Sequence, residues 1–154
     1  MTDTSEALPD VIITGQDALN YATSLLQAHG VHQSNANLIA QCLVAGDLRG
    51  IDTHGINRLP SYMARVRAGV LDAIATPEIK QVTPAVAQVD GRNGFGFLAA
   101  AAGIDKAVEM AQVFGIGMVS VKHSNHFGMS AWVVQRALES DMMSLVFTLS
   151  LIHI

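Results

Sequence analysis

The spacing of apolar residues changes partway along this chain, and that change limits the folds open to it. In the first half, apolar side chains recur every three to four residues, as in amphipathic helices. From Glu78 onward, short runs of valine and isoleucine are bounded by turn residues, which is typical of strands. We therefore predict a helical domain over residues 1–75, with its boundary between Gly69 and Pro77, and a mixed α/β domain over 76–148.

Individual elements follow from the same patterns. In the first domain we expect a helix opened by a capping box at Thr14–Asp17 and ended by Gly30, a second running toward Gly46 or Gly50, and a third over Leu59–Val66. In the second domain we expect two strands within Glu78–Val89 around a Thr83–Ala85 turn, a helix over about Phe97–Phe114, a strand over Met118–Val121, a helix over about Met129–Ser140 and a final strand from Ser144.

Charge and composition exclude several classes of function. The net charge is −4 and the nine Lys and Arg residues are scattered, so the chain lacks the basic stripe of a nucleic-acid binder. The acidic N-terminal sequence has no signal-peptide pattern, and no run approaches the roughly 18 to 20 apolar residues that span a bilayer. The single cysteine, Cys42, falls on the buried face of a helix and has no internal disulfide partner. We expect a cytoplasmic protein without a membrane or nucleic-acid partner.

A first polar cluster lies in the string GDLRGIDTHGINRLPSY. It contains Arg49, Asp52, Thr53, His54 and Arg58. A histidine exchanges protons near neutral pH, a hydroxyl can orient that proton, and an arginine holds a carboxylate with two hydrogen bonds. These groups suit reduction of a carbonyl or imine beside a carboxylate. Alternatively, the aspartate and threonine cap a helix while both arginines form surface ion pairs.

A second polar cluster, Lys122–Gly128, follows an apolar strand and opens a helix. Backbone N–H groups at a helix start favour phosphate, so part of a dinucleotide could bind there. The alternative is that Ser124 or Asn125 simply caps the helix. A metal-assisted hydrolase using His54, His123 and His126 is a further alternative, but no second cysteine or nearby carboxylate accompanies them, so we predict no metal site.

The glycines do not form a dinucleotide-binding fingerprint, so a standard Rossmann fold is not indicated. However, GDLRGIDTHGINRLPSY, VDGRNGFG and GIGMVSVKHSNHFG, in this order and spacing, resemble the type-2 malate/L-lactate dehydrogenase family over about Thr14–Thr148. That family includes ureidoglycolate dehydrogenase, diketogulonate reductase and piperideine/pyrroline-2-carboxylate reductase. The resemblance implies a helical domain, the start of a non-Rossmann mixed-sheet domain that binds NAD or NADP, and a homodimer with active sites near the subunit interface.

The resemblance also implies roles for particular residues. His54 matches the proton donor of the family's Ser-His-Gly motif, where Thr53 replaces the serine but keeps a relaying hydroxyl, and Arg58 would bind the carboxylate of a 2-oxo acid or cyclic imine. His126 would lie close to the nicotinamide, in some members as a proton acceptor. The cofactor segment matched here comprises His126, Phe127, Gly128, Met129 and Ser130.

Residues 149–154, LSLIHI, equal the translation of a transposase adapter end used in sequencing libraries. We interpret them as an artefact, although a genuine strand end has the same composition. On this interpretation the chain is the first part of a longer NAD(P)-dependent oxidoreductase and would be inactive alone. The competing interpretation is a non-catalytic interaction fragment whose helices dock on a partner.

Overall fold

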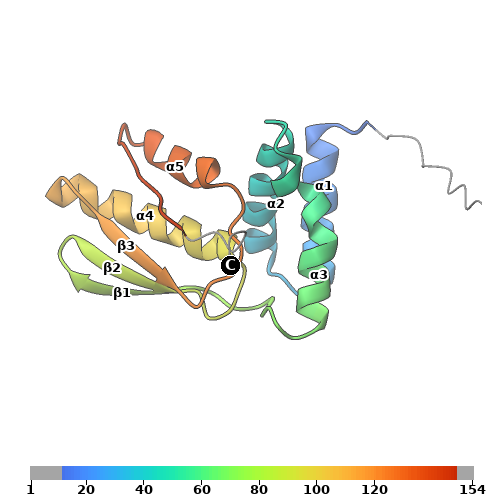
Figure 1. Ribbon diagram of the computed structural model, residues 1–154, viewed down its shortest axis with the longest axis horizontal. Helices are drawn as coiled ribbons and strands as arrows, with labels where there is room; N and C mark the ends of the chain where they lie inside the picture. Colours follow the sequence, from blue (N-terminus) through green and yellow to red (C-terminus); the bar gives the residue numbers. More distant parts are fainter. Residues whose placement is uncertain (1–11, 149–154) are drawn as a thin grey trace, which may run out of the picture.

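The computed structural model describes residues 12–148, which form a helical layer beside a sheet-containing layer (Figure 1). Figure 1 shows α1, α2 and α3 gathered on one side and the sheet with α4 and α5 on the other. The elements are α1 (Gly15–Ala28), α2 (Gln33–Asp47), the 3-10 helices η1 (Asp52–His54) and η2 (Ile56–Arg58), α3 (Leu59–Arg67), β1 (Glu78–Thr83), β2 (Val86–Asp90), α4 (Gly96–Phe114), β3 (Met118–Lys122) and α5 (Ser130–Leu138).

The first two helices pack together through their predicted apolar stripes. Thr14 caps α1 as predicted, because its hydroxyl accepts the Asp17 backbone N–H at 3.1 Å. The reciprocal bond of a capping box differs, since the Asp17 carboxylate accepts from the Thr14 hydroxyl at 2.7 Å and not from its backbone N–H. Leu26 of α1 and Ile39 and Leu43 of α2 are fully buried in one core cluster. Burying side chains of this size typically contributes about 1.5–3 kcal/mol each, so this contact anchors the helical layer.

The sheet has the order β1-β2-β3 and mixes both strand directions. The predicted hairpin is confirmed, since β1 and β2 pair antiparallel, whereas β3 pairs parallel to β2. A parallel neighbour needs a long crossover, which α4 supplies. The helix also covers one face of the sheet, and the inward-facing Ala87 and Val89 of β2 are fully buried. The carboxyl ends of β2 and β3 therefore share one edge of the sheet.

One aromatic cluster joins the two layers. Tyr62 of α3 packs edge-on against Phe95 and Phe97 at the start of α4, with ring centroids 6.2 and 5.6 Å apart. All three side chains belong to the same buried core as α1 and α2. The start of α4, and the loops beside it, are thus held against the helical layer.

The strand predicted from Ser144 does not form, which corrects that prediction. Residues 143–148 pair with no strand among residues 12–148, and Met143, Leu145 and Phe147 are more than 80% exposed. An apolar run becomes a strand only where another strand satisfies its backbone N–H and C=O groups. Residues 149–154, interpreted above as an artefact, lie outside the described range. None of the helices between residues 12 and 148 has the length and apolarity needed to cross a bilayer.

Candidate active site

The loop that carries His54 is fixed on the end of α2. The carboxylate of Asp47 accepts a hydrogen bond from the backbone N–H of Ile56 at 2.9 Å. The same carboxylate fills the space that a Cβ would need at Gly55, and a Cβ at Gly46 would approach the His54 carbonyl oxygen to 2.9 Å. Glycine at these two positions therefore lets the His54 loop lie directly against α2.

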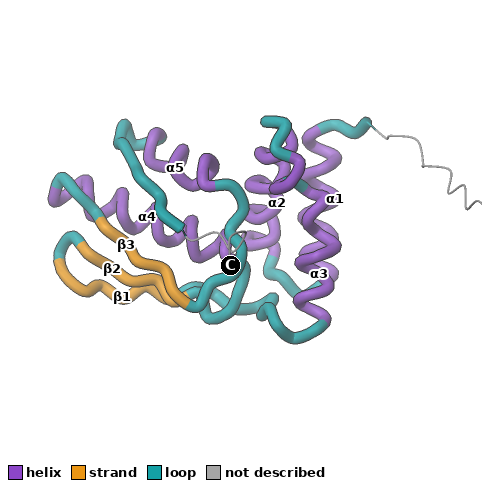
Figure 2. The backbone as a smooth tube through the Cα atoms, viewed as in Figure 1, coloured by secondary structure: helices purple, strands orange, loops and turns teal. Residues whose placement is uncertain are grey.

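The loop between β3 and α5, which carries His126, is also held in place by close contacts. Gly128 has φ +79°, and a Cβ there would come within 2.6 Å of the Phe97 ring and 2.9 Å of the Cys42 sulfur. The side-chain amide of Asn125 donates to the Asn93 carbonyl oxygen at 3.0 Å. This loop is thus held from α2, from α4 and from the turn after β2, and Figure 2 shows it passing between the helical layer and the α5 helix.

Gly128→Ala should lower the free energy of unfolding by about 2–5 kcal/mol, because it combines a strained left-handed backbone with overpacking against Phe97 and Cys42. Gly30→Ala is the matched control. Gly30 has φ +90° but nothing within 4 Å of its Cβ position, so it should lose only about 1–2 kcal/mol from backbone strain. Urea unfolding of both variants measures the difference. Equal losses would mean that the space around Gly128 is not tight.

The two loops bring together His54 and His126, which are 72 residues apart in the sequence. The rings of His54 and His126 lie 5.3 Å apart between centroids, tilted by 32°. The Thr53 hydroxyl lies 2.9 Å from Nδ1 of His54, and the Tyr62 hydroxyl lies 2.8 Å from Nδ1 of His126. The structure therefore places three of the predicted site residues, Thr53, His54 and His126, in one cluster.

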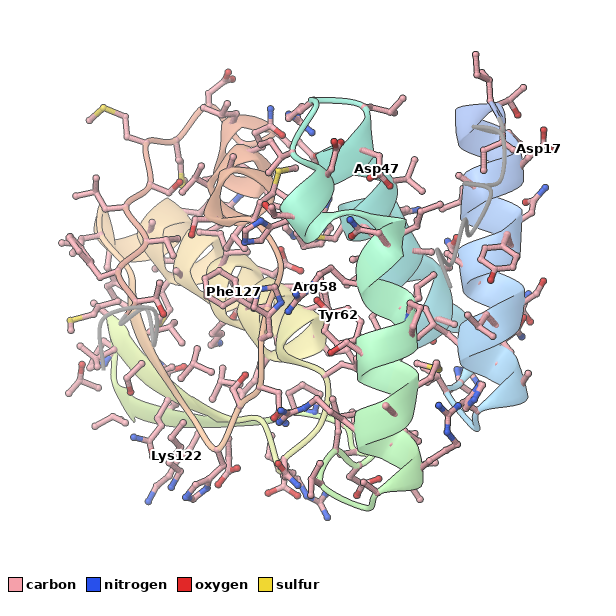
Figure 3. The ribbon with its side chains drawn as sticks, turned by 45° about the vertical axis from the view of Figure 1, so that its right-hand side comes forward. Asp17, Asp47, Arg58, Tyr62, Lys122 and Phe127 are labelled. Carbon is pink, nitrogen blue, oxygen red and sulfur yellow. The ribbon has the colours of Figure 1, made fainter. Side chains whose placement is uncertain are left out.

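Arg58 enters the same cluster from the start of α3. Figure 3 shows it beside Tyr62, where the helical layer faces the loop that carries Phe127. Among residues 12–148, its buried Nε has no hydrogen-bond partner and no carboxylate lies at ion-pair distance from its guanidinium. A buried, unpaired donor of this kind costs free energy unless an acceptor satisfies it. Among residues 12–148, the positive charge of Arg58 is thus not neutralised by an acidic side chain.

Burial and nearby positive charge shift the pKa values of two groups in the cluster, His126 and Tyr62. Burial, and then the charges of His54 and Arg58, lower the pKa of His126 below its usual value. Burial raises the pKa of the Tyr62 hydroxyl, which the nearby Arg58 partly opposes. Both groups are therefore neutral at pH 7, and Arg58 carries the fixed positive charge of the site.

The alternative interpretations of the two polar clusters are wrong. Arg49 bonds to the Ala45 carbonyl and the Gln135 side chain, and neither Arg49 nor Arg58 is among the ion pairs of the described residues. Asp52 and Thr53 form no side-chain cap on η1 or η2. The residue before α5 is Met129, which also makes no side-chain cap, so neither Ser124 nor Asn125 caps that helix.

His123 lies apart from the histidine pair. Its Nδ1 contacts the Asp90 carboxylate at 3.0 Å, at the carboxyl ends of β2 and β3. In residues 12–148 no group of three or more His, Cys, Asp and Glu side chains is arranged to hold a metal ion. The geometry therefore does not supply the three-histidine site of the hydrolase alternative.

The remaining residues of the predicted cofactor segment differ in accessibility. His126 is exposed, while Phe127 and Ser130 are half-buried. Gly128 and Met129 are buried, so they contribute backbone position rather than accessible side chains. Only His126, Phe127 and Ser130 therefore offer side chains to a ligand.

Sequence reasoning assigned no role to Tyr62 or Asp47, although the quoted motif string ends at the tyrosine. A signal was present, because Tyr62 follows Arg58 by four residues and side chains at that spacing share one face of a helix. The role of Asp47 had no such signal. Its contact with the loop of Gly55 depends on the chain folding back onto the end of α2.

A helical layer packs against a small mixed sheet, and His54, His126 and Arg58 lie at the junction, so this is an α/β protein with a polar cluster between its layers. The family model described as malate/L-lactate dehydrogenase matches residues 13–152. The chain belongs to the malate/L-lactate dehydrogenase family, which confirms the resemblance predicted from its motifs.

Characterised relatives agree with this membership. The chain is 31% identical over 138 residues to the malate/(S)-sulfolactate dehydrogenase of Methanothermus fervidus, covering 90% of this chain and 41% of that protein. It is 31% identical over 137 residues to the Δ1-pyrroline-2-carboxylate/Δ1-piperideine-2-carboxylate reductase of Pseudomonas aeruginosa, covering 88% and 41%.

The fold agrees as well. Sulfolactate dehydrogenase from Methanocaldococcus jannaschii superposes with a TM-score of 0.83 at 28% identity, covering 86% of this chain and 38% of that one. This similarity confirms the predicted mixed α/β class. The chain spans about two fifths of the length of the curated relatives it matches.

Proposed function

We propose that this chain forms part of an oxidoreductase that transfers hydride between NAD(P)H and C2 of a small carboxylate substrate, either a 2-oxo/2-hydroxy acid or a cyclic imine carboxylate. The observation that carries the proposal is the Arg58 guanidinium, which is buried at Nε, lacks an acidic partner among residues 12–148 and lies in the His54–His126 cluster. A substrate carboxylate would pair with this guanidinium through charge-assisted hydrogen bonds.

The two relatives act on different groups that share one feature. A malate or sulfolactate dehydrogenase handles a C–O group beside a carboxylate, and a pyrroline-2-carboxylate reductase handles a C=N group beside a carboxylate. Arg58 would hold the common carboxylate, and His54 would exchange the proton with the oxygen or nitrogen on the neighbouring carbon. The Thr53 hydroxyl, 2.9 Å from Nδ1 of His54, would fix the orientation of that ring.

The residues present fit a nicotinamide cofactor beside His126. His126 is exposed in the loop that leads into α5, and Ser130 is the first residue of that helix, where the first backbone N–H groups have no intrahelical partners. NAD or NADP would supply the hydride when bound. His126, Phe127 and Ser130 would orient it, and Gly128 and Met129 would hold the backbone in place.

Membership of the family also suggests how the domains and subunits of the whole protein are arranged. The helical domain of residues 1–75 would carry the substrate-binding Arg58 and His54, and residues 76–148 would begin the cofactor domain. With further native sequence the protein would be a cytoplasmic homodimer, whose active sites lie near the subunit interface.

The direct test follows NAD(P)H absorbance with a panel of 2-oxo acids and cyclic imine carboxylates, using this chain joined to the native sequence that follows it. We expect oxidation of NADH or NADPH with at least one carboxylate substrate, and none with the matching substrate amide, which Arg58 cannot hold as an ion pair. A folded protein without activity on any panel member would favour the non-catalytic interaction fragment. The exposed Met143, Leu145 and Phe147 would then be the first surface to examine.

A further inference from the structure

Tyr62 is a buried polar residue to which the proposed reaction assigns no role. It is only 2% exposed, and its ring packs between α3 and the aromatic residues Phe95 and Phe97. Its hydroxyl nevertheless reaches Nδ1 of His126 at 2.8 Å, with the two rings stacked at a centroid distance of 6.0 Å. A phenylalanine would fill the same apolar space, so packing alone does not require the Tyr62 hydroxyl.

A second contact decides which atom donates in this hydrogen bond. The backbone N–H of Gly128 also points at Nδ1 of His126, at 3.3 Å. A backbone N–H can only donate, so Nδ1 must present its lone pair and the proton of the neutral ring must reside on Nε2. The Tyr62 O–H therefore donates to Nδ1 as well, and it makes the shorter of the two contacts.

We propose that Tyr62 is a positioning residue that holds His126 as the Nε2–H tautomer, so that this imidazole presents a hydrogen-bond donor toward the substrate or cofactor. This inference rests on the proposed function for the identity of the acceptor, but not for the tautomer itself. Under this proposal, His54 and His126 have different roles. His54 exchanges the proton, while His126 donates a fixed hydrogen bond.

The surroundings of His126 support the neutral ring. The titratable or charged groups facing it are His54, Arg58 and Tyr62, together with the thiol of Cys42 beneath Gly128. Burial raises the pKa of Cys42 to about 11, so this thiol offers no negative charge to a protonated imidazole. A proton added at Nδ1 would also face the Gly128 N–H, which cannot turn to accept it.

The assignment changes the role expected for His126. An imidazole whose Nδ1 lone pair already accepts two hydrogen bonds, and whose Nε2 carries the proton, is not free to accept a proton from a substrate. It is suited instead to bind a carbonyl oxygen, either of the substrate or of the nicotinamide carboxamide. The role of proton acceptor that the family resemblance suggests for this position is then not available to the neutral ring.

The tautomer and the pKa of His126 can be measured on this 154-residue chain by long-range ¹H–¹⁵N NMR with ¹⁵N-histidine, with His126→Asn identifying the signals. We expect the Nε2–H form in the wild type. Tyr62→Phe should raise the pKa of His126 by about half to one unit, the shift expected when one hydrogen bond to the neutral form is lost, and should increase the Nδ1–H population. Tyr21→Phe on the exposed face of α1 is the control and should change neither.

A second experiment avoids deleting the hydroxyl. In the Tyr21→Phe background, 3-fluorotyrosine replaces only Tyr62 and makes its O–H a stronger donor, so the pKa of His126 should fall. An Nδ1–H tautomer in the wild type, or a His126 pKa and tautomer that respond to neither change at Tyr62, would overturn the proposal. Because these measurements need no turnover, their outcome is separate from that of the substrate panel.

Discussion

His54→Ala should lower kcat by about 10²- to 10⁴-fold in the protein assayed with its native downstream sequence, because it removes the group that exchanges a proton with the substrate heteroatom. The substitution leaves the backbone contact between Gly46 and the His54 carbonyl unchanged, so the loop should keep its position. Steady-state kinetics with the best panel substrate measures the effect, and a thermal melt confirms that the variant folds.

A matched histidine variant separates this role from the metal alternative. His123→Asn keeps a residue that tolerates the left-handed backbone at this position, where φ is +48°, and removes a ring that contacts only Asp90 among the hydrogen bonds of residues 12–148. We expect nearly normal kcat for His123→Asn. Comparable losses in both variants, with activity restored by added metal, would instead support a three-histidine metal site. Normal kcat in His54→Ala would remove His54 from the reaction.

Arg58→Ala should raise KM by about 10- to 100-fold with a smaller change in kcat, since a charge-assisted hydrogen-bonded pair contributes about 1.5–3 kcal/mol to binding. Arg58→Lys should recover only part of this loss, because a lysine keeps the charge but not the planar pair of donors. Substrate-dependent initial rates give KM and kcat separately for each variant.

Arg67→Ala provides the control for lost positive charge. Arg67 lies at the other end of α3, is exposed, and contacts His29 rather than the site. It should leave KM unchanged. If Arg58→Ala and Arg67→Ala raise KM equally, the effect comes from the overall field of the protein and not from a carboxylate held at Arg58.

Most of the secondary structure was predictable from local patterns. The N-cap at Thr14, the glycine stops, and the apolar spacing each act within a few residues, so α1 to α5 and the β1–β2 hairpin lie where the sequence predicts them. The strand from Ser144 was not predictable in this way. Whether that apolar run becomes a strand depends on a neighbouring strand, which residues 12–148 do not supply.

The residue types of the candidate site were visible in the sequence, but their assembly was not. The motif around Thr53, His54 and Arg58 and the segment after Lys122 stood out as two separate polar clusters, and their chemistry suggested a carboxylate substrate and a dinucleotide. Nothing local indicates that these clusters meet. Their meeting depends on Tyr62, Phe95 and Phe97 joining the helical layer to α4, and the same packing places the tyrosine hydroxyl on His126.

The helices, the hairpin, the family and the kinds of groups available for chemistry could all be predicted from the sequence, because caps, periodicity and motifs are encoded over short distances. The folded structure was needed to show that Nε of Arg58 has no hydrogen-bond partner among the described residues, that the rings of His54 and His126 lie 5.3 Å apart, and that Nδ1 of His126 faces two donors. These arrangements depend on close packing between segments far apart in the chain, such as Gly128 against Cys42 and Phe97. Short-range sequence patterns do not encode such contacts.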